Sequence, residues 1–290
     1  MANRCSVAIR FFPTPPSLGD LISTIFLLEV DLPDGETVSD LLLPEWATLR
    51  FFDVPVVSAS NRQGMQGSDT RLAVTGPHSQ ETRFEITRSR HWGVSLQPLG
   101  WARLMGVPAH AYANALVDGE TEPLCARFLP LLDTLFSEKA DADGEYARLV
   151  AFLDGLPRAN VADEEKIGAI SDLLLDPHIA TSSEFAQRAG VCQRTLERTS
   201  RRVFGFTPKM LLRRRRFMRS LTDFMMDPSL KWIGAIDAVY HDQAHFVRDF
   251  HSFMGMKPSE YAALEKPIMG PVLHAREAFL RDEAKRRTKH

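Results

Sequence analysis

The chain has 290 residues and a net charge of −2; 44% of its residues are hydrophobic and 25% are charged. This composition is typical of one or two globular domains, and no apolar run reaches the ~18 residues that a membrane-spanning helix requires. The three cysteines, Cys5, Cys125 and Cys192, are scattered along the chain. Their spacing predicts neither a disulfide framework nor a paired metal site, and it favours a reducing cytoplasm.

The N-terminal part of the chain has the pattern of short strands. Residues 1–120 contain several extended segments separated by proline, glycine and aspartate, and polar and apolar residues alternate most clearly over 82–87. Such a series favours a small β-barrel or a sandwich. Two helical segments follow, over 123–136 and 144–156. The apolar stripe on the first is wide enough to pack in a core or against a second copy of the chain.

We expect no catalytic residue, metal or cofactor in this part. The sequence has no HExxH, GxSxG or phosphate-loop motif. A convincing metal site needs about three or four ligands at suitable spacing. In the N-terminal part only His78 with Glu81 comes near this pattern, and His241 with His245 has no third ligand nearby in the sequence.

The segment 154–163 contains a glycine and a proline and no periodic pattern, so it predicts a linker. The two sides of this linker differ in charge. Residues 1–159 contain 13 basic and 20 acidic residues, a net −7, whereas residues 160–290 contain 22 and 17, a net +5. The basic side suggests contact with a polyanion, although a solvated basic face would have the same charge.

An internal repeat at a constant offset of 50 residues organises the C-terminal half. The matched pairs of the repeat are Leu196 with Phe246, Arg198 with Arg248, Val203 with Phe253, Gly205 with Gly255, and Pro208 with Pro258. Each copy predicts a helix that is closed by a left-handed glycine, followed by a proline that begins the next segment.

A second short helix precedes each copy, which makes the unit a helix-turn-helix. In the first unit, residues 181–184 supply helix-capping side chains, Ala186 allows a close helix crossing, and Gly190 takes the turn. The second unit keeps a small residue at Ala235 but has Val239 at the turn. A valine adopts a positive φ only at a cost, so the geometry of the second turn is less strongly specified.

Between the two units, residues 208–226 predict one long helix, which makes an all-α module of about seven helices over 164–264. The run from Arg213 to Arg216 lies on this helix and spreads over about 300° of its circumference, so the four side chains cannot all face DNA. We expect at least one to lie beside the apolar side of the helix, with Arg216 as the candidate.

Residues 164–264 resemble the DNA-binding domain of the AraC/XylS family of transcription regulators over its whole length. The resemblance rests on the first helix-turn-helix, on Arg216-Phe217, and on the signature over 246–250 and 255–261. It departs from the family at Val239 and in its density of arginine. The resemblance implies a DNA-binding domain over 163–265, a cupin-like sensor and dimerisation domain over 1–157, and a basic tail over 266–290.

In such a unit the second helix enters the major groove, and the N-terminal half of that helix contacts base edges. The candidate base-contacting residues are Arg194, Glu197 and Arg198 in the first unit and Gln243, His245 and Arg248 in the second. Arginine can pair with guanine, glutamate with cytosine and glutamine with adenine. The candidate phosphate-contacting residues are Gln193, Arg201, Arg202 and Lys209. Asp242 and Asp249 lower the positive potential of the second helix, so we expect this helix to contribute less base-specific binding energy than the first.

The sequence therefore predicts an α+β chain that is a sequence-specific transcription regulator, controlled by a ligand or signal through its N-terminal domain. A DNA-targeted enzyme with a catalytic barrel and a non-specific architectural binder are the alternatives; the different faces of the two reading helices argue against the latter. The expected partners are double-stranded DNA, a second copy bound through the N-terminal helices, RNA polymerase and an unidentified small-molecule effector, with no cofactor and no membrane.

Overall fold

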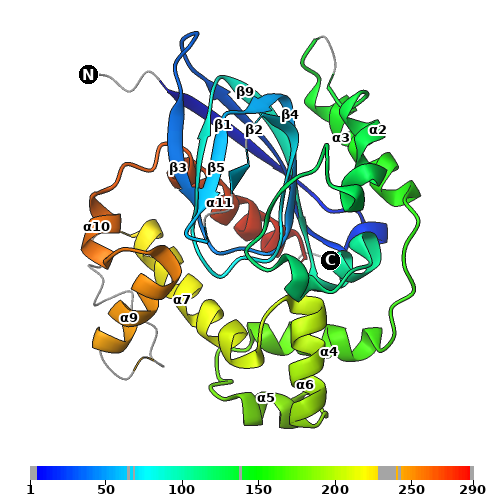
Figure 1. Ribbon diagram of the computed structural model, residues 1–290, viewed down its shortest axis with the longest axis vertical. Helices are drawn as coiled ribbons and strands as arrows, with labels where there is room; N and C mark the ends of the chain where they lie inside the picture. The colour runs from blue at the N-terminus through cyan, green and yellow to red at the C-terminus, as the bar shows by residue number, and fades with distance from the viewer. Residues whose placement is uncertain are drawn as a thin grey trace.

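The computed structural model describes residues 5–63, 66–67, 69–136, 139–227, 240 and 243–287. Figure 1 shows two sheets at the N-terminal end of the chain, with the described helices between residues 164 and 263 gathered on one side of them. The last described helix, α11 (Met269–Arg287), returns to the sheets. The predicted α+β class is confirmed.

The N-terminal strands form two separate antiparallel sheets. The six-stranded sheet has the order β1 (Ser6–Phe12), β2 (Ile22–Asp31), β9 (Ser89–Leu96), β4 (Thr48–Val56), β7 (Thr70–Thr75) and β10 (Leu116–Asp118). The four-stranded sheet has the order β3 (Val38–Leu42), β8 (Thr82–Ile86), β5 (Ser58–Asn61) and β6 (Gln66–Gly67). Of the small β-barrel and the sandwich that the strand pattern favoured, a closed barrel is not formed by the described residues, because β1 is an edge strand that α11 (Met269–Arg287) covers instead of another strand.

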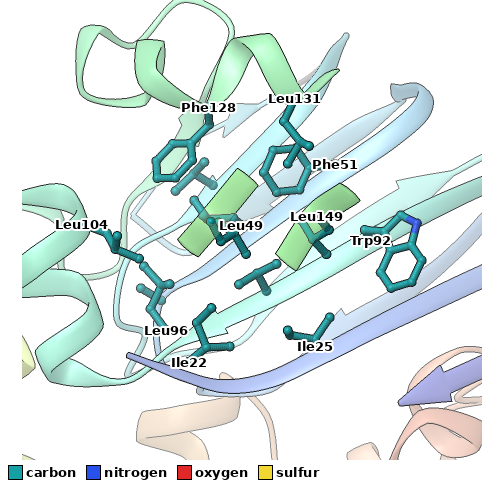
Figure 2. Packing of buried hydrophobic residues seen from close by; sticks show 14 of the residues in the cluster. Ile22, Ile25, Leu49, Phe51, Trp92, Leu96, Leu104, Phe128, Leu131 and Leu149 are labelled. Atoms are coloured by element: carbon teal, nitrogen blue, oxygen red, sulfur yellow. The ribbon is translucent and has the colours of Figure 1, made fainter. Parts of the chain in front are cut away.

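Strand β9 shows how the alternating pattern divides the six-stranded sheet into two faces. Trp92 and Val94 point to one face and join the main hydrophobic core, whereas His91 and Ser95 point to the other. Figure 2 shows the core face, where Ile25, Leu49, Phe51 and Trp92 of the sheet pack with residues of the covering helices. Helical segments therefore cover this face of the sheet, whereas the opposite face borders a cavity.

Short helical segments cover the core face of the sheet. They are α1 (Pro98–Gly100), η2 (Trp101–Met105), η3 (Ala109–Tyr112), η4 (Pro123–Phe128), α2 (Leu129–Leu132) and α3 (Ala142–Gly155), after a first turn η1 (Pro16–Leu18). The two helical segments predicted after the strands are confirmed, the first as η4 followed by α2. Its stripe, including Phe128, Leu131 and Leu135, is buried in the core of the same chain. The stripe is therefore not free to bind a second copy.

Helix α3 is tied to the sheet by a buried ion pair. Glu145 accepts hydrogen bonds from the guanidinium of Arg90 at 3.0 and 3.1 Å and from the indole nitrogen of Trp92 at 2.9 Å. The carboxylate is fully buried, so these partners are needed to offset its loss of hydration.

The C-terminal half is helical, as predicted. It contains α4 (Glu164–Leu175), α5 (Ser182–Arg188), α6 (Gln193–Thr199) continuing into η5 (Ser200–Phe204), α7 (Pro208–Met226), α9 (Gln243–Met254) and α10 (Pro258–Ala263). The turn of the second unit, with Ala235, Val239, His241 and Asp242, lies outside the described residues. Residues 269–287, predicted as part of a basic tail, form α11.

Helix α11 is anchored to the first strands at its N-terminal end. The buried carboxylate of Asp40 in β3 accepts the backbone N–H groups of Ile268 and Met269 at 2.9 and 2.8 Å. Ile268 is buried among side chains of both sheets, and Leu273 packs against the core of α7 and α9. The helix thus depends on partners distant in sequence, which explains why its own weak periodicity did not predict it. Among the described helices, none is long and apolar enough to cross a membrane.

Candidate nucleic-acid interface and internal cavity

The first helix-turn-helix is built as the sequence predicted. Thr181 caps α5, since its hydroxyl accepts the N–H of Glu184 at 3.2 Å. Gly190 makes the turn with a φ of +64°, a conformation that favours glycine. Leu196 of α6 packs with Phe185 of α5 in the small core of this unit. The two helices are therefore locked together, with α6 in the position of a reading helix.

The face of α6 opposite Leu196 is polar and exposed. Arg194 and Arg198 lie on it, Gln193 is exposed at the start of the helix, and Arg201, Arg202 and Lys209 are exposed further along the chain. Glu197 is half-buried and accepts a hydrogen bond from Arg201 at 2.8 Å. A cytosine contact by Glu197 would therefore have to share the carboxylate with Arg201.

The second reading helix, α9, has a smaller exposed polar face. Gln243 and Arg248 are exposed. His245 is turned toward the protein, with its ring 5.1 Å from that of Tyr240 and its Nε2 4.0 Å from a carboxylate oxygen of Asp249. The predicted base contact from His245 therefore competes with contacts inside the chain.

Asp249 does not weaken the potential of α9 in the way the sequence suggested. Its side chain is 3% exposed and accepts two hydrogen bonds from Arg213 of α7, at 2.6 and 3.1 Å, and one from Tyr240 at 3.2 Å. The carboxylate is thus buried and paired, because α7 brings an arginine to it. That partner lies 36 positions away in the sequence.

All four members of the arginine run have roles inside the protein. Arg213 binds Asp249; Arg215 donates to backbone carbonyls that follow α4, including that of Ile179 at 2.8 Å. Arg214 and Arg216 are buried. The structural role expected for Arg216 agrees with its burial, but the sequence did not single out Arg214.

Arg214 joins the linker helix to the N-terminal domain. Its guanidinium lies 3.8 Å from the centre of the Trp46 ring and donates to the carbonyls of His78 at 2.9 Å and Glu45 at 3.2 Å. Burial lowers the pKa of Arg214 to about 9, against the opposing effect of Glu45. The residue is still charged at neutral pH, so the cation belongs to the contact between the two halves.

The loop between β7 and β8 touches both helix-turn-helix units. A Cβ on Gly205, the cap of the first unit, would lie 3.1 Å from the ring of Pro77. At the equivalent Gly255 it would lie 2.7 Å from the carboxylate of Glu81. The N–H of Glu81 also donates to the carbonyl of Phe253 at 2.9 Å. One loop therefore holds the same position of both repeats, which no local pattern could have predicted.

The open face of the six-stranded sheet looks into a cavity of about 700 Å³. Phe26, Phe52 and His91 line it from the six-stranded sheet, and Phe84 and Ile86 line it from the four-stranded sheet. The cavity continues to the DNA-binding half, where its wall includes Met218 and Thr222 of α7 and Val272 and Arg276 of α11. It is thus bounded by both halves of the chain.

His91 is a buried titratable residue of the cavity wall. Its Nδ1 atom is buried and has no hydrogen-bond partner in the described part of the chain, and its ring lies 4.4 Å from the ring of Phe52. Burial, and secondly the charge of Arg50, lower the pKa of His91 to about 3, so the imidazole is neutral at physiological pH. The alternation of β9 could have placed His91 opposite Trp92, but it could not have shown the cavity.

The described residues contain no group of three or more His, Cys, Asp or Glu side chains that could hold a metal ion. His78, which the sequence paired with Glu81, is buried and binds the carbonyl of Gly76 at 2.6 Å through Nδ1. Burial is the main reason that its pKa is lowered. Glu81 instead accepts from Arg62 at 3.0 Å, and burial raises the pKa of this carboxyl.

Residues 185–263 match a family model described as a helix-turn-helix domain. No curated protein matches the chain. The similar solved structures include ToxT from Vibrio cholerae at 9% identity, with 90% of this chain and 98% of that chain covered and a TM-score of 0.41. An unsaturated-fatty-acid-bound ToxT from the same organism is 10% identical, with 79% and 95% covered and a TM-score of 0.40. The AraC-like transcriptional activator CuxR is 14% identical, with 74% and 86% covered and a TM-score of 0.29.

Proposed function

We propose that this chain, a DNA-binding transcription regulator by its AraC-type helix-turn-helix domain, is controlled by a small molecule that binds in the cavity between its two sheets. The observation that carries the proposal is a single cavity wall shared by the sensor sheets and the linker helix α7. An occupant would touch both halves of the protein, and binding that differs between two arrangements of the halves is what allows a ligand to shift their equilibrium.

For DNA we propose that α6 is the stronger reader. Arg194 and Arg198 are exposed on one face of that helix and can each pair with guanine in the major groove. In the second unit, Gln243 and Arg248 have the same freedom, whereas His245 contributes less because it already contacts Tyr240 and Asp249.

Glu197 shares its carboxylate with Arg201, so we assign it a secondary part in base reading. The exposed side chains of Gln193, Arg201, Arg202 and Lys209 are suited to contact phosphates, which hold the register without reading sequence. The differing residues on α6 and α9 support two different half-site sequences and argue against a non-specific architectural role.

The two units are held in one relative position by the loop between β7 and β8. Pro77 packs on the cap of the first unit, and Glu81 is bonded to the helix end of the second. We therefore propose that the units read two segments of major groove about one helical turn apart on the same face of the DNA. A second copy of the chain and RNA polymerase stay predictions from the family resemblance.

The test begins with selection of bound sites from random DNA by the full-length chain. Enrichment of a bipartite site is expected, and insertion of about 5 bp between its halves should abolish tight binding because one half moves to the opposite face. Unchanged affinity after the insertion would show that one unit alone reads DNA. Failure to enrich any sequence would overturn the proposed function.

A further inference from the structure

The inner part of the cavity is built mainly from apolar and aromatic side chains. Phe26 and Phe52 come from one sheet and Phe84 from the other. Gly93 makes room for this arrangement, since a Cβ there would lie 2.0 Å from the ring of Phe26. The whole cavity has a volume of about 700 Å³, which is in the range of pockets that bury most of a small organic ligand. The aromatic lining suits a molecule with an apolar, ring-containing body that can pack against these side chains.

His91 interrupts this lining with a hydrogen-bonding group that is not used. The residue is 6% exposed and lines the cavity, and its buried Nδ1 atom has no hydrogen-bond partner within the described residues. The Phe52 ring lies against it, and the Phe26 ring stands edge-on at 6.1 Å. A buried polar group normally has a hydrogen-bond partner, because burial removes the hydrogen bonds that water would make to it. A molecule bound in the cavity can supply the hydrogen-bond partner that His91 lacks.

The charged groups near His91 are already committed. Arg50 is buried and donates to the Glu45 carboxylate and to the hydroxyl of Thr75 at 3.1 Å. Arg214 is held by backbone carbonyls and the Trp46 ring. An anionic group placed beside His91 would therefore lose its hydration without gaining an uncommitted cation. The inner end of the cavity favours a neutral polar group.

We propose that the cavity takes an apolar, ring-containing molecule with one neutral hydroxyl or carbonyl group, and that His91 hydrogen-bonds to that group. This inference rests on the proposed control by a ligand and names the class of that ligand. A neutral imidazole has one donor and one acceptor nitrogen, so it can serve either a hydroxyl or a carbonyl. Water in the cavity is the competing partner of the same histidine.

The test uses three probes with the same ring system on the full-length chain. They are 1-naphthol with a neutral hydroxyl, naphthalene with none, and 1-naphthoate with an anionic group. His91→Phe keeps an aromatic ring and removes both nitrogens. We expect this change to lower the affinity for 1-naphthol about tenfold, as for one lost hydrogen bond, and the affinity for naphthalene less than about twofold. We also expect the wild type to bind 1-naphthol more tightly than 1-naphthoate.

A matched control makes the same change at an exposed histidine outside the cavity wall. His110→Phe removes an imidazole that does not line the cavity and should leave 1-naphthol affinity within about twofold. His91→Gln restores a donor and an acceptor and should recover most of the affinity. If His91→Phe does not fold, histidine NMR of the wild type gives the same answer, since 1-naphthol and not naphthalene should shift the His91 ring signals.

Three results would overturn the proposal. The first is that His91→Phe loses affinity for 1-naphthol and for naphthalene to the same extent. The second is that the wild type binds 1-naphthoate more tightly than 1-naphthol, and the third is that it binds none of the probes. None of these touches the DNA-reading part of the proposed function, which is tested separately by site selection. If the chain selects a site and binds 1-naphthol through His91, but the ligand never changes DNA affinity, then only the proposed ligand control fails.

Discussion

The guanidinium of Arg214 lies 3.8 Å from the centre of the Trp46 ring. The arginine belongs to the helix that links the two helix-turn-helix units, and the tryptophan lies in the segment between β3 and β4 of the N-terminal sheets. The same guanidinium donates to two backbone carbonyls in loops that connect the strands. A buried cation thus couples the helix-turn-helix half to the half that contains the sheets.

Replacing Arg214 by methionine should destabilise this contact. The methionine fills similar space but leaves the carbonyls of Glu45 and His78 without their donor, which we expect to cost about 2–4 kcal/mol in the free energy of unfolding. Urea denaturation measures it. Arg202→Met is the control, because Arg202 is exposed and its loss should cost less than about 0.5 kcal/mol. Equal effects of the two changes would contradict a coupling role for Arg214.

The two glycine turns of the first unit predict different costs of substitution. Gly190 and Gly205 both have positive φ, +64° and +84°. A Cβ on Gly190 would meet nothing within 4 Å, whereas one on Gly205 would press on the ring of Pro77. Gly190→Ala should therefore lower the free energy of unfolding by about 1–2 kcal/mol because of the left-handed backbone alone, and Gly205→Ala should lower it clearly more. Thermal or urea unfolding of both variants checks the order, and equal costs would show that Pro77 is not held against the turn.

Asp40 should control the start of α11. In Asp40→Ala the N–H groups of Ile268 and Met269 lose their acceptor, a loss comparable to that of a helix cap, about 0.5–2 kcal/mol. Amide hydrogen exchange over residues 268–273 should then speed up about tenfold. Asp40→Asn keeps an oxygen acceptor and should change the exchange by less than about threefold. Protection that is unaltered in Asp40→Ala would show that apolar packing alone anchors the helix.

His91 should make stability depend on pH. Because burial lowers the pKa of His91 to about 3, the folded protein keeps it neutral while the unfolded chain takes up a proton below about pH 6.5. Its contribution to the free energy of unfolding is therefore full above pH 6.5 and is lost as the pH falls toward 3. Between pH 7 and 5 the wild type should lose about 2 kcal/mol more than His91→Phe. Parallel urea titrations at the two pH values measure this, and His78 cancels because both proteins have it.

Arg198 should read one base pair. Arg198→Ala should weaken binding to the selected site by about 1–3 kcal/mol and relax the preference at a single position. Lys209→Ala, a change at a proposed phosphate contact, should weaken binding to all DNA sequences alike. It should also reduce the salt slope of the binding constant by about one ion. A uniform loss in Arg198→Ala, with the smaller salt slope, would reassign Arg198 to phosphate. Competition binding at several salt concentrations distinguishes the two.

The helix-turn-helix units were predictable because their signals are local. Glycine caps, the Thr181 cap and the buried Leu196 act within one or two turns of helix, and their repetition at an offset of 50 residues shows the duplication without any long-range information. The exposed face of α6 follows directly from the helical period. The short strands were also predictable, since alternation is a local pattern.

Other features depend on contacts between distant segments. The two sheets stay separate because α11 covers the edge of β1, and the sequence of α11 alone does not reveal where it packs. The four consecutive arginines look alike in sequence, yet α7 directs Arg213 to Asp249 and Arg214 to Trp46. His91 is buried against the rings of Phe26 and Phe52, which come from other strands. Burial and partnership are properties of the assembled fold, so only the tertiary structure decided where the cavity lies and how the two halves meet.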